Sequence, residues 1–209
     1  MSKQKYYVVW EGNRTGIFDS WTECQQAVKN FPGPRFKSFR NKDIAEFAYR
    51  AGPGRNLWDF ISEKDYQELS EKVELPELNS LSVDAACSGN PGIMEYRGVD
   101  TKSAISLFHQ GPFAEGTVNI GEFLAIVHGL AQLKKEKKNI PIYSDSLTAM
   151  KWVRDKRLNT KLARTARNQQ LFLYVDRALV WLKSNEYSNP ILKWNTEVWG
   201  EIPADFGRK

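Results

Sequence analysis

The fold is decided by the stretch Leu81-Ser82-Val83-Asp84-Ala85, an apolar strand with one carboxylate inside it. A charge in such a strand is costly to bury unless it is paired or bound to a cation; the alternative is an edge-strand aspartate that faces water. A turn follows at Ser88-Gly89-Asn90-Pro91-Gly92, and residues 95–99 and 103–109 resume an extended pattern. The sequence therefore predicts three successive strands from residue 81 onward.

Helical and extended segments alternate downstream of these strands. The hydrophobic periodicity predicts helices over residues 119–133, 146–154 and 161–184, short strands over 140–143 and 191–194, and a short helix from Gly200. Elements in this order predict the α/β class, here a mixed five-stranded sheet flanked by helices, as one domain over residues 79–209.

A small αβ module is expected upstream, over residues 1–50. Extended patterns at residues 6–10, 17–18 and 35–39 alternate with two helices, the first capped by Asp19 or Ser20 and the second by Asn41. Residues 51–78 change composition to three basic and seven acidic residues. We interpret them as an acidic linker that holds a short helix over residues 63–73.

The charge distribution favours a polyanionic partner. The chain carries a net charge of +5, with nine basic and five acidic residues in residues 1–50 and eighteen and thirteen in residues 81–209. Two basic segments thus flank the acidic one, as in many nucleic-acid-binding proteins, although proteins that bind nothing acidic also reach this charge.

The sequence carries no signal for export or membrane insertion. The N-terminal residues lack a long apolar run and a cleavage site, and no stretch approaches the roughly 18 apolar residues that a membrane helix needs. Cys24 and Cys87 are too far apart to suggest a disulfide framework or a metal motif. We expect a cytoplasmic protein with no membrane partner and no obligate protein partner.

Three further acidic residues stand at the boundaries of the predicted elements. Glu122 is three residues after Asn119, which is also the spacing of a capping box, and Asp145 follows a strand, where it could instead cap the next helix. Asp205, near the end of the chain, could be a solvated charge that shares a helix face with Glu201. Together with Asp84 they are hard oxygen ligands of the kind that suits Mg²⁺ or Mn²⁺.

Four ordered blocks carry a resemblance to a known family. They are Val83-Asp84-Ala85 with Gly89-Asn90-Pro91-Gly92, Asn119-Ile120-Gly121-Glu122-Phe123-Leu124-Ala125, Tyr143-Ser144-Asp145-Ser146, and Trp199-Gly200-Glu201-Ile202-Pro203-Ala204-Asp205. Residues 79–209 thereby resemble type 1 ribonuclease H. The N-terminal block around Tyr6-Tyr7-Val8-Val9-Trp10 is similar to the hybrid-binding domain that precedes the catalytic domain in many relatives. The two domains in this order most resemble the bacterial ribonucleases H that carry a hybrid-binding domain.

The resemblance implies an endonuclease that hydrolyses the RNA strand of RNA–DNA hybrids and leaves 5′-phosphate and 3′-hydroxyl ends. Asp84, Glu122, Asp145 and Asp205 would hold two Mg²⁺ ions, with Mn²⁺ able to substitute. Glu122 would also accept a hydrogen bond from the ribose 2′-hydroxyl that marks a strand as RNA.

The resemblance also implies contacts to nucleic acid. In the second domain these are the turn residues Cys87, Gly89 and Asn90 at the minor groove, and Thr117, Asn119, Thr160 and Thr196 at a DNA-strand phosphate. In the first domain they are Trp21, Phe36 and Lys37, which would bind the hybrid and also double-stranded RNA. Ordinary loop and cap chemistry is the alternative for the threonines, and a place in the core is the alternative for Trp21.

Two departures from the family pattern stand out. Many relatives carry a histidine before the last aspartate, whereas the histidines here are His109 and His128, so Glu201 is the candidate substitute in catalysis, or else a surface glutamate. The basic residues between Lys151 and Arg167 do not form a long basic insertion and are more typical of a solvated helix face. A non-catalytic hybrid binder and a strand-transfer enzyme of the same fold remain the competing hypotheses.

Overall fold

The computed structural model describes residues 4–53 and 57–207. The chain divides into two compact units. The first holds the described residues up to Pro76 together with Asn195–Glu201, and the second holds Glu77–Trp194 together with the described residues from Ile202 onward. The division groups residues 51–76 with the N-terminal module; the predicted linker at residues 51–78 stays a prediction.

The second unit is built on a mixed five-stranded sheet. Its strands are β4 (Leu81–Gly89), β5 (Gly92–Asp100), β6 (Ser106–Gly116), β7 (Ile142–Ser144) and β8 (Ile191–Lys193), in the order β6-β5-β4-β7-β8. β4, β5 and β6 are antiparallel, and β7 and β8 continue the sheet in parallel from β4. The predicted fold class is confirmed, and β4 occupies the centre of the sheet.

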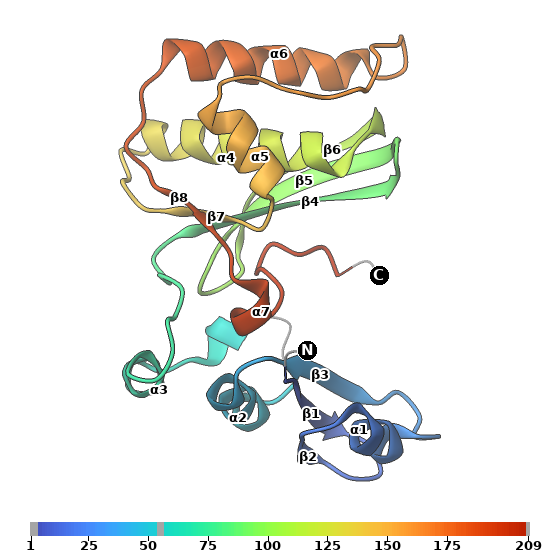
Figure 1. The fold of residues 1–209 in the computed structure, drawn as a ribbon. Helices are drawn as coiled ribbons and strands as arrows, with labels where there is room; N and C mark the ends of the chain where they lie inside the picture. Colours follow the sequence, from blue (N-terminus) through green and yellow to red (C-terminus); the bar gives the residue numbers. More distant parts are fainter. Residues whose placement is uncertain (1–3, 54–56, 208–209) are drawn as a thin grey trace. The chain divides into compact units, whose positions relative to one another are not determined.

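Helix α4 (Val118–Lys135) covers the sheet, and α5 (Leu147–Arg154) and α6 (Gln169–Ser184) pack on α4, with α6 in the outermost layer (Figure 1). Ten residues of α4 are buried, so this helix is apolar on nearly all sides, as expected for an element with protein on both faces. Its side chains join Leu81, Val83 and Ala85 of β4 in one core.

The predicted helix over residues 161–184 begins later, because α6 starts only at Gln169. The preceding segment is a loop in which Asn168 Nδ2 donates to the Ala163 carbonyl and Asn168 Oδ1 accepts from the Thr165 amide. Short polar side chains that bond the nearby backbone compete in this way with helical hydrogen bonds.

The first unit contains a three-stranded antiparallel sheet in the order β2-β1-β3. Its elements are β1 (Tyr6–Glu11), β2 (Gly16–Phe18), α1 (Trp21–Val28), β3 (Arg35–Phe39), α2 (Lys42–Ala51), a short 3₁₀ helix (Leu57–Phe60) and α3 (Glu63–Ser70). The predicted caps are confirmed: Ser20 accepts from the Glu23 amide, and Asn41 accepts from the Ile44 amide.

The segment Asn195–Glu201 belongs to this first unit and contains the short helix α7 (Thr196–Trp199). Trp199 Nε1 donates to the Glu74 carbonyl at 2.7 Å, and Arg40 pairs with Glu197 at 2.6 Å. The prediction of a helix that starts near Gly200 is wrong, because Gly200 ends α7 with a φ of 78°.

Within residues 4–53 and 57–207, none of the helices combines the length and the apolar character that crossing a bilayer requires.

Candidate active site

Asp84 lies on β4 just beyond its pairing with β7. The edge-strand alternative is wrong, because β4 has β5 on one side and β7 on the other, and Asp84 is only 9% exposed. The parallel register pairs Ser82 with Tyr143. Two residues beyond this pair, the same register leads to Asp84 on β4 and to Asp145 just past the end of β7, so the sheet topology places these two carboxylates beside each other.

Asp145 stands between β7 and α5 but does not cap the helix. The N-cap is Ser146, whose hydroxyl accepts from the Ala149 amide at 3.2 Å. Ser144 Oγ accepts from the Ser146 amide at 3.2 Å, so two serine hydroxyls satisfy the backbone of this turn. Capping of α5 therefore does not explain why an aspartate stands at position 145.

Glu122 reaches the same place from α4. The capping-box alternative is wrong: the N-cap of α4 is Thr117, and Asn119 is already inside the helix. Gly121 allows the approach, because a Cβ there would lie 2.6 Å from Ala85 Cβ and 2.7 Å from Met94 Sδ. The missing side chain lets α4 lie close against β4 and β5, and the next residue, Glu122, is carried toward Asp84.

The three carboxylates form a cluster suited to a hard cation. Asp84, Glu122 and Asp145 each offer one oxygen, and these oxygens all lie within 4.8 Å of one another. Three acidic groups at this distance repel one another unless some are protonated or a cation lies among them. Carboxylate oxygens in such number fit Mg²⁺ or Mn²⁺, so the donor set present agrees with the predicted kind of metal.

Burial and mutual repulsion raise the proton affinity of this cluster. Burial raises the pKa of Asp84 to about 8, reinforced by the charges of Asp145, Glu122 and Asp205 and opposed by a hydrogen bond from the Ala85 amide. Burial raises the pKa of Glu122 to about 7, with Asp145 adding to the shift and a Ser146 hydrogen bond and the Lys193 ammonium opposing it. Such displaced values are typical of functional sites.

Asp205 lies in the C-terminal segment that begins at Ile202, where the chain returns to the second unit. Its charge contributes to the raised pKa of Asp84, so it lies within electrostatic reach of the cluster. Residues 202–207 form neither helix nor strand, so the proposed helix face shared by Glu201 and Asp205 does not exist. Glu201 itself is grouped with the first unit, as is Thr196.

An exposed aromatic cluster marks the surface of the first unit. Trp21 is 47% exposed and Phe36 is 39% exposed, which excludes the core alternative for Trp21. The Trp21 ring centroid lies 6.0 Å from that of Phe36 and 5.6 Å from that of Tyr7. Lys37 follows on the same strand and is half-buried. Neighbouring exposed rings can contact sugars, whereas the Lys37 side chain points to the opposite face of β3 from Phe36, because successive side chains of a strand alternate.

Most of the N-terminal part of the first unit is similar to a known domain family. Residues 5–49 match the family described as the ribonuclease H1 N-terminal domain. The resemblance to type 1 ribonucleases H is thereby confirmed. The chain is 33% identical over 78 residues to ribonuclease H1 of Rattus norvegicus, an alignment that covers 37% of this chain and 23% of the rat protein. For ribonuclease H1 of Homo sapiens the figures are 35% over 69 residues, 33% of this chain and 20% of the human protein. The alignments thus span about a fifth of these relatives.

Solved structures of ribonucleases H are similar to 55% of the chain. A ribonuclease H1 isolated from compost by a metagenomic approach is 15% identical with a TM-score of 0.35, and 82% of it is covered. The enzyme of Halobacterium salinarum is 18% identical, also with a TM-score of 0.35, and 83% of it is covered. At these values the likeness does not decide the fold, which rests on the observed strand order.

The predicted nucleic-acid contacts of the second unit lie at the ends of its strands and in two loops. Cys87 is half-buried on β4 with its thiol donating to the Gly116 carbonyl, and Gly89 has a φ of 121° at the end of the same strand. Thr117 caps α4 without a side-chain hydrogen bond to it, and Asn119 is exposed. Asn90 is exposed in the turn to β5, and Thr160 is half-buried and accepts from the Leu162 amide.

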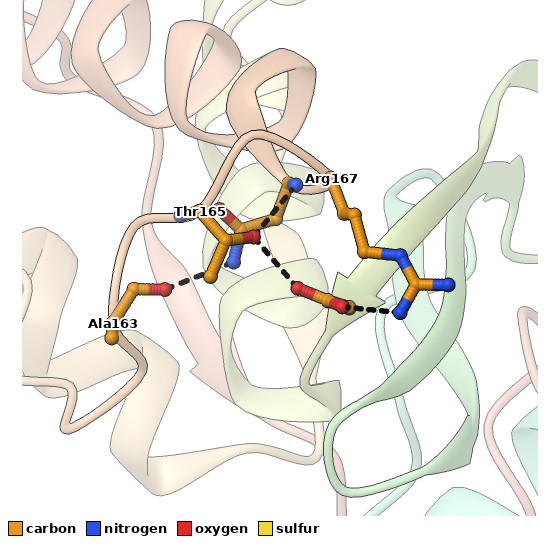
Figure 2. A network of polar contacts seen from close by, with 5 residues as sticks. Ala163, Thr165 and Arg167 are labelled. Carbon is orange, nitrogen blue, oxygen red and sulfur yellow. Dashed lines mark hydrogen bonds and ion pairs between the residues drawn. The ribbon is translucent and has the colours of Figure 1, made fainter.

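The loop that carries Thr160 is tied to the end of β6, shortly before Thr117. Thr165 Oγ1 donates to Glu115 Oε2 at 2.7 Å and Arg167 Nη1 donates to Glu115 Oε1 at 3.2 Å, so both residues bind one carboxylate (Figure 2). The prediction of a basic helix face is wrong for this segment, because residues 155–168 are a loop beyond α5. Its arginines also serve structure: Arg164 forms a two-pronged ion pair with Asp176 at 2.6 and 2.7 Å.

The two histidines take no place in the carboxylate cluster. His128 stacks on Phe108 with ring centroids 4.0 Å apart, and burial lowers its pKa, so it is packed and not solvated. His109 lies on β6, where Nε2 is 2.7 Å from Glu95 Oε2.

Sequence reasoning missed four residues that the structure brings to these sites. Tyr7 completes the aromatic cluster, Ser146 hydrogen-bonds Glu122, Lys193 acts on the charge of Glu122, and Arg97 contacts the Asp205 segment. Tyr7 gave no surface signal, because it shares a face of β1 with the buried Val9 and packs against the core that contains Val9. The other three depend on contacts between distant segments and leave no local signal.

Proposed function

We propose that this protein is an endonuclease that hydrolyses the RNA strand of RNA–DNA hybrids, leaving 5′-phosphate and 3′-hydroxyl ends. The observation that carries the proposal is the cluster of Asp84, Glu122 and Asp145, whose oxygens lie within 4.8 Å of one another. The ribonuclease H1 N-terminal domain at residues 5–49 supports a hybrid as the substrate. One solved relative of this fold is described in complex with an RNA/DNA hybrid.

Asp84, Glu122, Asp145 and Asp205 would hold two Mg²⁺ ions, and Mn²⁺ would substitute for them. Bound there, the pair of ions would supply a nucleophilic water at neutral pH and stabilise the leaving oxygen of a phosphodiester. The chain provides the carboxylate oxygens for this, and because the pKa of Asp84 is raised to about 8, cation binding would displace its proton.

Glu122 has a second task, to accept a hydrogen bond from the ribose 2′-hydroxyl and so to distinguish RNA from DNA. The Ser146 hydroxyl donates to Glu122 and fixes the orientation of its carboxylate for both tasks. Glu201 takes the role that a histidine plays in many relatives, assisting turnover.

The remaining predicted residues grip the substrate. Cys87, Gly89 and Asn90 approach the minor groove through small side chains and backbone, and Thr117, Asn119, Thr160 and Thr196 bind a DNA-strand phosphate. Trp21 and Phe36 pack on sugars while Lys37 meets a phosphate. Residues 1–50 are thus the binding domain, for hybrids and also for double-stranded RNA, and residues 79–209 are the catalytic domain.

The test is cleavage of an end-labelled RNA–DNA hybrid, with double-stranded RNA and single-stranded RNA of the same sequence alongside. Each substrate is incubated with Mg²⁺, with Mn²⁺ and with EDTA. We expect cleavage of the hybrid alone, in either metal and not in EDTA. Binding of the hybrid without cleavage in either metal would favour the competing function, a non-catalytic hybrid binder.

A further inference from the structure

The carboxylate of Asp205 depends on a segment that has no regular structure of its own. Residues 202–207 form neither helix nor strand, and within them the Asp205 amide donates to the Ile202 carbonyl while the Gly207 amide donates to Asp205 Oδ2. Such local bonds set the shape of a turn but do not attach it to the rest of the unit. Burial of Ile202 and Ala204 anchors the start of the segment, and a polar contact from the sheet can orient the part that carries Asp205.

Arg97 on β5 supplies that contact. Its Nε donates to the Ala204 carbonyl at 2.7 Å, and its Nη2 donates to the Asp205 carbonyl at 2.6 Å. The planar guanidinium thus grips two consecutive carbonyls, a geometry that fixes orientation as well as position. In the antiparallel register, Arg97 is the direct partner of Asp84. The segment is therefore attached at the level of the cluster.

The next residue of the segment strengthens the same attachment. The Arg97 guanidinium lies 4.7 Å from the centroid of the Phe206 ring, a cation–π distance. The same ring also neighbours His109, at 6.0 Å between ring centroids; His109 is the cross-strand partner of Arg97 and is hydrogen-bonded to Glu95. Two adjacent strands thus bind Ala204, Asp205 and Phe206 with Arg97 at the centre.

We propose that Arg97 is a positioning residue that holds the Asp205 carboxylate beside Asp84, and that its loss lowers the rate of cleavage without lowering affinity for the hybrid. This inference rests on the proposed function. Arg97 contacts the backbone of the Asp205 segment and not the carboxylate, so it acts on where the carboxylate lies. Misplacement of a reacting group by about 1 Å can cost on the order of 100-fold in rate.

The test compares Arg97→Met, Arg97→Lys and the wild type in the full chain. In Arg97→Met we expect kcat on the hybrid to fall by about 10- to 100-fold, with KM and hybrid Kd within about twofold. Arg97→Lys can still donate to the carbonyls but lacks the planar fork, so its kcat should lie between the two. Arg177→Met, an exposed arginine of α6, is the matched control and should leave kcat unchanged.

A second measurement does not depend on cleavage. Hydrogen exchange of the Asp205, Phe206 and Gly207 amides should be at least about tenfold faster in Arg97→Met, while the amides of α4 keep their wild-type rates. Unchanged exchange and kcat in Arg97→Met, or a loss confined to KM, would overturn the positioning role. A wild type that cleaves no hybrid would instead overturn the proposed function, and the exchange rates would still decide whether Arg97 holds the segment.

Discussion

The carboxylate cluster of the second unit and the aromatic cluster of the first are both arrangements that folding alone disfavours, but in opposite ways. Asp84 is an acidic side chain that is only 9% exposed, whereas Trp21 is a large apolar ring that is 47% exposed. Burying charge costs free energy that a cation can return, and exposing rings leaves apolar area that a ligand can cover. The carboxylate cluster is suited to catalysis and the aromatic cluster to substrate binding. Substitutions in the first should therefore change the cleavage rate, and substitutions in the second should change the affinity for the hybrid.

The largest effect should come from removing one ligand of the buried cluster. Asp145→Asn keeps the size of the side chain but removes its charge, and we expect hybrid cleavage to fall by more than about 100-fold. Hybrid affinity should stay within about twofold, because the aromatic cluster is untouched. The check is single-turnover cleavage together with a binding titration, with the exposed Asp155→Asn as control. Wild-type turnover in Asp145→Asn would remove Asp145 from the site.

A smaller loss should follow when the cluster is displaced without changing its charges. Gly121→Ala places a Cβ 2.6 Å from Ala85 Cβ, so α4 must shift and carry Glu122 with it. We expect about 1–3 kcal/mol of destabilisation and at least about tenfold slower cleavage per folded molecule.

The matched control for that variant is Gly129→Ala, on the same helix. Its Cβ would meet the end of the Leu81 side chain at 2.6 Å, two turns farther from Glu122. We expect a comparable loss in chemical denaturation but normal cleavage. If both variants cleave the hybrid equally fast, the close packing at Gly121 does not determine the geometry of the site.

The sequence predicted the two regions unequally, for physical reasons. Motif order alone placed Asp84, Glu122 and Asp145 on three elements that the sheet brings together. Judged singly, Glu122 and Asp145 had capping explanations that only the structure removed, since the caps are Thr117 and Ser146. A cap depends on where the first helical turn begins, and sequence periodicity locates that only to within a residue or two.

Other features could not be predicted because they depend on segments distant in sequence. Nothing near Arg97 indicates that it binds the carbonyl of Asp205, 108 residues later. The late start of α6 depends on side-chain bonds of Thr165 and Asn168, which local periodicity does not record. The aromatic cluster was predicted in part: Trp21 and Phe36 were expected at the binding surface, and Tyr7 was not.

In the aromatic cluster, Trp21→Ala should weaken hybrid binding without changing the cleavage rate at saturating hybrid. Loss of one stacking ring costs about 1–3 kcal/mol, or about 5- to 150-fold in Kd. Because the ring is 47% exposed, the free energy of unfolding should change little. Binding at moderate salt and cleavage at saturating hybrid measure the two effects. Tyr49→Ala, which removes another exposed ring of the same unit, is the control. Unchanged affinity in Trp21→Ala would refute the contact role.

The smallest effect concerns stability and pH. Because the folded state raises the pKa of Asp84 to about 8 and of Glu122 to about 7, it holds their protons more tightly than the unfolded chain does. Without metal, the free energy of unfolding should therefore fall as the pH rises from about 4 toward 8. Mg²⁺ should raise the Tm more at pH 8 than at pH 6, and Asp84→Asn should flatten both trends. Thermal unfolding in EDTA and in Mg²⁺ is the measurement, and a metal-free Tm that climbs from pH 6 to pH 8 would argue against this electrostatic picture.

We propose that the cluster of Asp84, Glu122 and Asp145 binds divalent cations and that these cations are required to cut the RNA of a hybrid. The most direct measurement follows one labelled hybrid with the wild-type protein in Mg²⁺, after addition of EDTA, and after Mg²⁺ is restored in excess. We expect cleavage to stop when EDTA removes the metal and to resume when Mg²⁺ is restored. Cleavage that continues in EDTA, or that never begins in Mg²⁺ or Mn²⁺, would contradict it.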